Sequence, residues 1–147
     1  MKITVIDGQG GNIGKRIVEE IKGRRSDVFI TAIGTNSQAT FAMMKGGADQ
    51  GATGENPVVL SMREADVVIG PIGIILADSM LGEITPRMAE AVGASRARKI
   101  LIPINRCVTV AGVDEALTLS EYIKLAVDKI ENLGFGKHHC LKPDFLL

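Results

Sequence analysis

The stretch ITVIDGQGGNIG, residues 3–14, decides the fold. It begins with a short β-branched run, which is typical of a strand, and passes through a carboxylate into a glycine-rich turn. Isoleucine and valine then recur at positions 13, 17, 18 and 21, which is the spacing of one helix face. A strand, a tight turn and an amphipathic helix are therefore predicted at the amino end, as the first unit of an α/β fold.

The same alternation continues along the chain. Further strands are expected at 28–33, 50–52, 67–69 and 100–102, with a sixth, edge strand at 108–110. The runs at 67–69 and 100–102 are continuously apolar, as in central parallel strands covered on both faces. Helices are expected to start with Ser37, Asn56-Pro57, Thr85-Pro86 and Thr118, the last in a capping box with Glu121.

These elements predict a three-layer Rossmann-like α/β sandwich with a mainly parallel sheet of five or six strands. Nothing in the sequence marks a second domain, so we expect one domain over 1–147. The end of the chain, 135–147, is too apolar for a solvated linker, and we expect it to dock as a C-terminal tail.

Composition and charge limit the classes of binding partner and the cellular compartment that we expect. The 147 residues carry 17 Lys+Arg against 17 Asp+Glu, which argues against nucleic acid and membrane surfaces as partners. Zero net charge also favours self-association, so a homodimer is predicted, with contacts from 72–81 and from Phe145-Leu146-Leu147. A carboxylate at position 7 comes too early for a signal peptide, and Cys107 and Cys140 are far apart, which together favour the cytoplasm.

A nucleotide or dinucleotide site is predicted at the carboxyl edge of the sheet. In open parallel sheets, ligands bind there, beside the first strand, where the strand order reverses. Glycines let backbone N–H groups approach a phosphate at the start of the next helix. The candidate binding residues are Gly8, Gln9, Gly10, Gly11, Asn12, Ile13 and Gly14, with Thr35 and Asn36 after the second strand and Gly70, Pro71 and Gly73 after the fourth.

The glycine turn departs from the standard fingerprints. Ile13 stands where a strict G-x-G-x-x-G needs glycine, and Gln9 and Arg16 exclude a P-loop. The segment 34–36 offers neither an acid for a ribose nor an arginine for a 2′-phosphate, so NAD(P) competes with a mononucleotide or another small anion. The turn could also serve only close packing of helix on sheet. Asp7 would repel a phosphate unless it caps the N–H of Gly10 or Gly11.

Two other functions stay open. A small enzyme could act on an anionic metabolite, with Arg106 binding the anion and Asp7 or Cys107 reacting, although a buried, inert Cys107 is the simpler interpretation. Asp78, Ser79 and Glu83 could supply acid–base groups near the crevice, or be solvated at a helix end. The alternative without catalysis is an oligomeric scaffold.

The tail carries no predicted metal site. His138 and His139 are adjacent, so they cannot easily turn to one ion together, and Cys140 beside them leaves the fourth ligand missing.

Several motifs together carry a resemblance: IDGQGG at 6–11, GATGEN at 51–56, IGPIGI at 69–74 and SMLGEIT at 79–85. The chain resembles a family of small, uncharacterised bacterial Rossmann-like proteins, which implies one compact cytoplasmic domain and no particular chemistry. A looser likeness to short-chain dehydrogenases covers only the first strand, turn and helix. There Gly8 and Gly14 match the outer glycines of T-G-x-x-x-G-x-G, and Asp7 and Asn12 replace its threonine and middle glycine. The catalytic Tyr–Lys pair of that family is absent, because Tyr122 is followed by Ala126.

Overall fold

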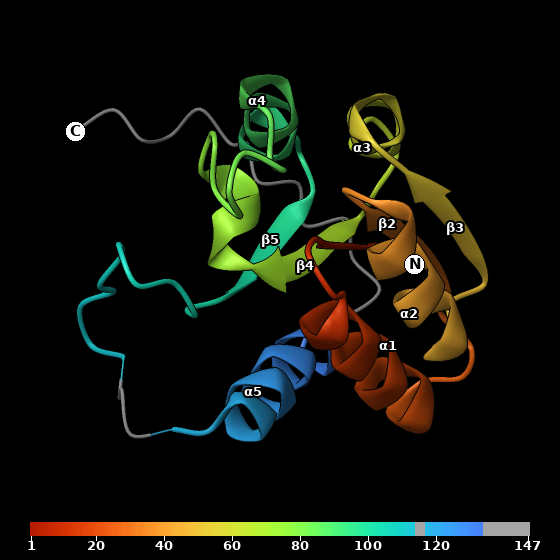
Figure 1. Ribbon diagram of the computed structural model, residues 1–147. Coiled ribbons are helices and arrows are strands. Elements are labelled where there is room, and N and C mark those ends of the chain that lie inside the picture. Colours follow the sequence, from red (N-terminus) through yellow and green to blue (C-terminus); the bar gives the residue numbers. More distant parts are fainter. Residues whose placement is uncertain (114–116, 134–147) are drawn as a thin grey trace.

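The computed structural model describes residues 1–113 and 117–133. Its centre is a parallel five-stranded sheet in the order β3-β2-β1-β4-β5. The strands are β1 (Lys2–Asp7), β2 (Phe29–Gly34), β3 (Gln50–Thr53), β4 (Val67–Pro71) and β5 (Arg98–Ile102). The chain builds outward from β1 to β3 and then returns to add β4 and β5 on the other side (Figure 1). This confirms the predicted α/β sandwich.

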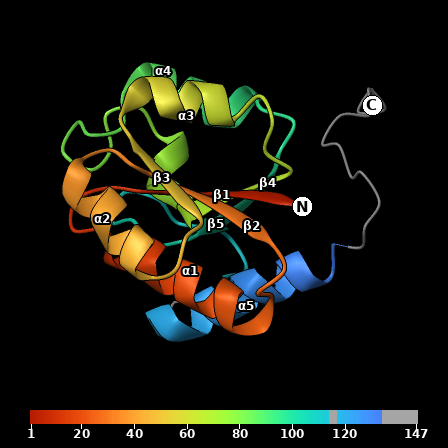
Figure 2. The ribbon, with the colours of Figure 1, turned by 90° about the vertical axis from the view of Figure 1, so that its right-hand side faces the viewer.

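Helices cover both faces of the sheet (Figure 2). One face carries α1 (Asn12–Arg24), α2 (Ser37–Lys45) and α5 (Leu119–Glu131), and the other carries α3 (Glu55–Ser61) and α4 (Pro86–Ala94). Alternate strand residues supply each face: Ile3 and Val5 pack with α1 and α5, while Ile6 packs with α3 and α4. The apolar stripe of α1 is therefore buried as its spacing predicted.

The helix starts agree with the sequence in part. Thr85 caps α4 by accepting from the N–H of Met88, and Thr118 forms the expected capping box with Glu121. Ser37 is not the cap of α2, because the side chain of Asn36 accepts from Ala39 N–H instead.

Two other local expectations are wrong. The helix α3 begins at Glu55 after Gly54, so Asn56 and Pro57 lie inside its first turn rather than at its cap. Residues 108–110 form no strand, and the described sheet has five strands rather than six. The residues from Val108 to Val110 leave the sheet instead of pairing with β5, as part of the connection that leads toward α5 (Figure 1).

The apolar run after Asp66 is mostly buried, with residues 67–71, 73 and 74 in the core. It forms β4 and then a short 3-10 helix, η1 (Ile72–Ile75), at the carboxyl edge of the sheet. No helix in the described part of the chain is long and apolar enough to cross a membrane. The expected tail docking at 135–147 and the residues His138, His139 and Cys140 lie outside the described residues.

Candidate functional site

The strand order reverses beside β1, which pairs with β2 on one side and β4 on the other. At the carboxyl end of β1 begins the turn 8–14, and the segments after β2 and β4 start at the same edge. The structure thus brings the predicted binding residues of three segments to one crevice, as the rule for open parallel sheets requires.

Asp7 ends β1 and is almost completely buried, with 4% of its surface exposed. Its two carboxylate oxygens accept hydrogen bonds from the N–H of Gly8 at 2.8 Å and of Gly14 at 2.7 Å. It therefore caps the first turn of α1 through Gly14, and not through Gly10 or Gly11, the two N–H groups considered from the sequence. Burial raises the pKa of Asp7, and the backbone N–H groups that it accepts from oppose this shift.

Packing and conformation distinguish Gly11 and Gly14 from Gly10 in this turn. A Cβ on Gly11 would lie 2.6 Å from Ala39 Cα, and its φ of +72° favours glycine. A Cβ on Gly14 would lie 2.5 Å from Met43 Sδ, whereas one on Gly10 would meet nothing closer than 4.0 Å. The packing interpretation thus explains Gly11 and Gly14, and Gly10 is left as the glycine with an open approach from solvent.

Glu83 reaches across the crevice to the turn. Its Oε2 accepts from Gln9 N–H at 2.7 Å, from Thr35 Oγ1 at 2.5 Å and from Asn36 Nδ2 at 3.1 Å. Asn36 Nδ2 also donates to the Gln9 carbonyl at 3.0 Å, which ties the two loops together. We name these three converging donors the anion seat.

The anion seat stabilises a negative charge through uncharged groups. The N–H of Gln9 and the hydroxyl of Thr35 hold the pKa of Glu83 below its ordinary value, so this carboxyl is ionised at neutral pH. Within 1–113 and 117–133, no lysine or arginine hydrogen-bonds to Glu83 or to Asp7. An anion is thus held here without a cationic partner.

Met80 fills the crevice between β1 and β4. A Cβ on Gly8 would lie 2.7 Å from Met80 Sδ, and one on Gly73 would lie 3.4 Å from Met80 Cε. Met80 thus packs near both glycines, and Ser79 Oγ lies closer still to Gly73, 3.1 Å from its Cβ position. Gly70 has a different role, because its own Cβ would lie 2.3 Å from the Ile6 carbonyl oxygen inside the sheet.

Met80 and Glu83 belong to a closed loop between η1 and α4, which we name the 78–84 loop. Its ends meet through backbone bonds from Asp78 N–H to Ile84 O at 2.8 Å and from Ile84 N–H to Ser79 O at 3.2 Å. Asp78, Met80 and Leu81 all have left-handed φ angles, 64°, 55° and 57°. Such angles are unfavourable for residues other than glycine, so this loop keeps its shape against local strain.

The other catalytic candidates lie apart from these contacts. Arg106 and Cys107 follow β5 in the irregular segment that extends away from the sheet (Figure 1). Cys107 is exposed, so the simpler interpretation of a buried thiol is wrong. In the described chain, no hydrogen bond or ion pair joins Asp7 to either residue. The structure adds no support to a reaction that would need all three together.

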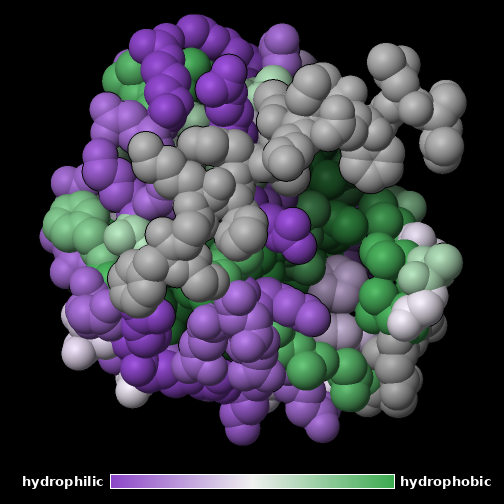
Figure 3. Space-filling model, turned by 180° about the vertical axis from the view of Figure 1, so that it is seen from behind, coloured by the Kyte–Doolittle hydropathy of each residue, from purple (hydrophilic) through white to green (hydrophobic). Residues whose placement is uncertain are grey.

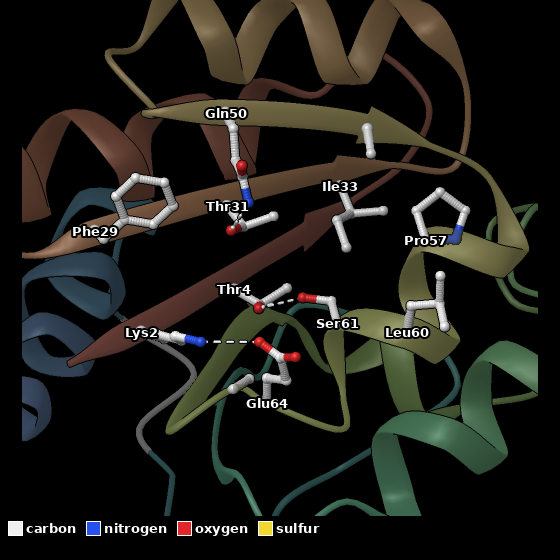
Figure 4. A pocket seen from close by; sticks show the side chains of 12 residues that line it. Lys2, Thr4, Phe29, Thr31, Ile33, Gln50, Pro57, Leu60, Ser61 and Glu64 are labelled. Atoms are coloured by element: carbon white, nitrogen blue, oxygen red, sulfur yellow. Dashed lines mark hydrogen bonds and ion pairs between the residues drawn. The ribbon is translucent and has the colours of Figure 1, made fainter.

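A separate pocket of about 380 Å³ lies on the α3 face, toward the amino ends of the strands (Figure 4). It exists because α3 has only seven residues and leaves part of β1, β2 and β3 uncovered. Its walls are polar and apolar together, and Thr4 Oγ1 and Ser61 Oγ hydrogen-bond at 2.7 Å. The lining residues are Lys2, Thr4, Phe29, Thr31, Ile33, Gln50, Ala52, Pro57, Leu60, Ser61, Glu64 and Ala65. None of the predicted binding residues is among them.

Sequence reasoning missed two features. It named Glu83 only as an acid–base candidate, and it did not name Met80, although both lie in the SMLGEIT motif. The pocket also had a signal, because the polar Thr4 and Thr31 alternate with apolar neighbours along their strands.

Hydrophobic side chains also reach the surface. Figure 3 shows green hydrophobic and purple polar parts side by side on one face of the molecule. Within the segment 72–81, which we expect to form a contact between copies, Leu81 is 97% exposed. The homodimer stays a prediction, and the second expected contact, 145–147, lies outside the described residues.

Comparison with known proteins assigns the chain to a family. The family described as Domain of unknown function (DUF3842) matches residues 2–134. The chain belongs to this family. Membership confirms the expected uncharacterised-domain family, whereas the bacterial source stays a prediction. The search of curated proteins finds no match to this DUF3842 chain.

Among solved structures, the DUF3842 chain is similar to the crystal structure of a dodecameric FMN-dependent UbiX-like decarboxylase from Escherichia coli O157:H7. The identity is 16%, the match covers 89% of this chain and 76% of the other, and the TM-score is 0.48. The fold class of the DUF3842 domain rests on its own strand order.

Proposed function

We propose that the domain binds a nucleotide at the carboxyl edge of the sheet. One phosphate oxygen would bind the anion seat, and a planar ring would lie between Gly8 and Gly73. The observation that carries this proposal is the convergence of three uncharged donors on a single oxygen, Glu83 Oε2. Backbone N–H and hydroxyl groups that converge in this way bind phosphate oxygens as well as carboxylates.

The same geometry favours one phosphate over two. In dinucleotide sites, the pyrophosphate sits at the amino end of the first helix. Here the carboxylate of Asp7 already takes the N–H of Gly14 in that first turn. A second phosphate would meet this buried negative charge at close range, and in the described chain no basic side chain contacts Asp7 or Glu83 to offset it. We therefore propose a nucleoside monophosphate rather than NAD(P) as the ligand, without committing to a reaction.

Isothermal titration calorimetry tests this proposal. The panel compares AMP and FMN, which carry one phosphate, with ATP, NAD, NADP and FAD. We expect the monophosphates to bind more tightly than the others. The Glu83→Ala variant, in which the anion seat is vacated, is titrated beside the wild-type protein. If neither protein binds AMP or FMN, the proposal is contradicted.

Gly10 supplies a matched pair of variants. It is exposed and has open space around its Cβ position, so both Gly10→Ala and Gly10→Asp fit the fold. We expect Gly10→Ala to keep binding and Gly10→Asp to abolish it, because the new carboxylate would stand in the approach of the phosphate. Equal binding by the two variants would place the ligand elsewhere.

A further inference from the structure

We infer that the 78–84 loop blocks the site by occupying it: Glu83 takes the place of the ligand phosphate, Met80 takes the place of its ring, and an arriving nucleotide displaces both. The inference rests on the proposed function, because it assumes a ligand at the same edge. It adds that the wild-type protein is self-inhibited and that one loop controls access.

The loop matches the proposed ligand at two points. Glu83 offers a single anionic oxygen to all three donors of the anion seat, which leaves no place there for a second anion. Met80 packs near the Cβ positions of both Gly8 and Gly73, with Ser79 of the same loop beside it at Gly73. An apolar group and an anion, three residues apart in sequence, thus fill the crevice in the arrangement that a ring and a phosphate would need.

The loop can leave the crevice without losing its own backbone bonds. Asp78 N–H to Ile84 O and Ile84 N–H to Ser79 O close it on itself, and Gly82 N–H donates to Asp78 O at 3.1 Å. Ile84 is fully buried and anchors the carboxyl end of the loop in the core. Small surface loops with joined ends can move as units, so displacement breaks the side-chain contacts of Met80 and Glu83 and the hydrogen bonds from Ser79 to the Gly73 and Leu76 carbonyls.

The blocking position is also held against strain. Asp78, Met80 and Leu81 have left-handed φ angles, and the apolar Leu81 is 97% exposed at the loop's outer side. Backbone strain of this kind is typical of segments with two arrangements of similar free energy. A ligand therefore competes with the side-chain contacts that the strained loop makes in the site.

The test measures the affinity of AMP for the intact chain by calorimetry. The variants are Glu83→Ala, Met80→Ala, the double variant Met80→Ala/Glu83→Ala, and Leu81→Ala as the matched control. Leu81 lies in the same loop and also becomes alanine, but its side chain is 97% exposed. If the open arrangement is populated at about 1–10% in the wild-type protein, removing the block raises the apparent affinity about tenfold to a hundredfold. We expect this increase for the double variant and no change for Leu81→Ala.

A second measurement follows the anion seat directly. The N–H of Gln9 donates to Glu83, so its hydrogen exchange should be slow in the wild-type protein and faster in Glu83→Ala. Added AMP should slow this exchange again in the variant, and this readout requires only that the variant folds, which thermal melting checks.

The outcomes separate the two proposals. Equal AMP affinity of the wild-type protein and the double variant overturns the self-blocking loop and leaves nucleotide binding standing. An equal gain in Leu81→Ala also overturns it, because the effect would then come from general loosening. No binding of AMP or FMN by any variant overturns both proposals.

Discussion

The turn after β1 and the 78–84 loop face each other across one crevice, but they keep their shapes by different means. The turn is fixed by packing, because Gly11 and Gly14 lie against neighbouring helix residues and Asp7 is buried beneath them. The loop is fixed mainly by bonds to itself, with left-handed angles at three residues that are not glycine. The turn has one left-handed residue that is not glycine, Gln9 at φ 49°, against three in the loop. Packing therefore fixes most of the turn, and backbone strain is concentrated in the loop that occupies the site.

The largest expected effect is on the free energy of unfolding, when one glycine of the turn and one of the 78–84 loop are each replaced by alanine. Gly11→Ala combines a left-handed φ of +72° with a Cβ 2.6 Å from Ala39 Cα, so we expect a loss of about 3 to 5 kcal/mol in the free energy of unfolding. Gly82→Ala has φ +89° but no atom within 4 Å, so about 1 kcal/mol is expected. Urea unfolding measures both, and equal losses would contradict the assignment of packing to the turn.

Removing either carboxylate of the site should lower the free energy of unfolding, and the loss should again be larger on the side of the turn. Asp7→Ala leaves the buried N–H groups of Gly8 and Gly14 without their acceptor, which should cost about 2 to 3 kcal/mol. Glu83→Ala should cost about 1 kcal/mol or less, because Gln9 is exposed and Thr35 and Asn36 are only half-buried, so these donors can bind water instead. Thermal and urea unfolding of the two variants decide this, and a larger loss for Glu83→Ala would mean that the loop carries the fold.

The pH dependence of stability should distinguish them further. The folded protein holds the pKa of Glu83 below its ordinary 4.5, so its contribution is present above that value and is lost as pH falls through the depressed pKa. Burial raises the pKa of Asp7 above 3.8, so its contribution has the opposite sign and is lost as pH rises. The stability gap between the wild-type protein and Glu83→Gln should therefore shrink on acidification, since Asp7 is common to both. A gap that is constant in urea titrations between about pH 3 and pH 7 would contradict the ionised contact.

The smallest expected effect is an increase in the free energy of unfolding. Leu81→Asn places a residue that tolerates left-handed angles at φ 57° and removes an exposed apolar side chain. We expect thermal unfolding to show stabilisation of about 0.5 kcal/mol. A loss of stability would show that Leu81 packs on something in solution, such as a second copy of the chain.

The sequence predicted the framework better than the occupant of the site. Strand runs and the stripe of α1 depend on local spacing, which is why the sheet and its first helix could be predicted. The cap of α2 moved from Ser37 to Asn36 because neighbouring cap formers compete within one turn, which spacing cannot resolve. Met80 and Glu83 could not be assigned, because their positions depend on left-handed angles that no local pattern indicates.

The edge strand β3 has only four residues, Gln50–Thr53, and its side chains are mostly at the surface. A free strand edge can pair with the same edge of another molecule and extend a sheet without limit. A short and polar edge offers few consecutive partners for such pairing. Copies of this domain are therefore expected to meet through side chains, as discrete assemblies, rather than to grow as fibrils.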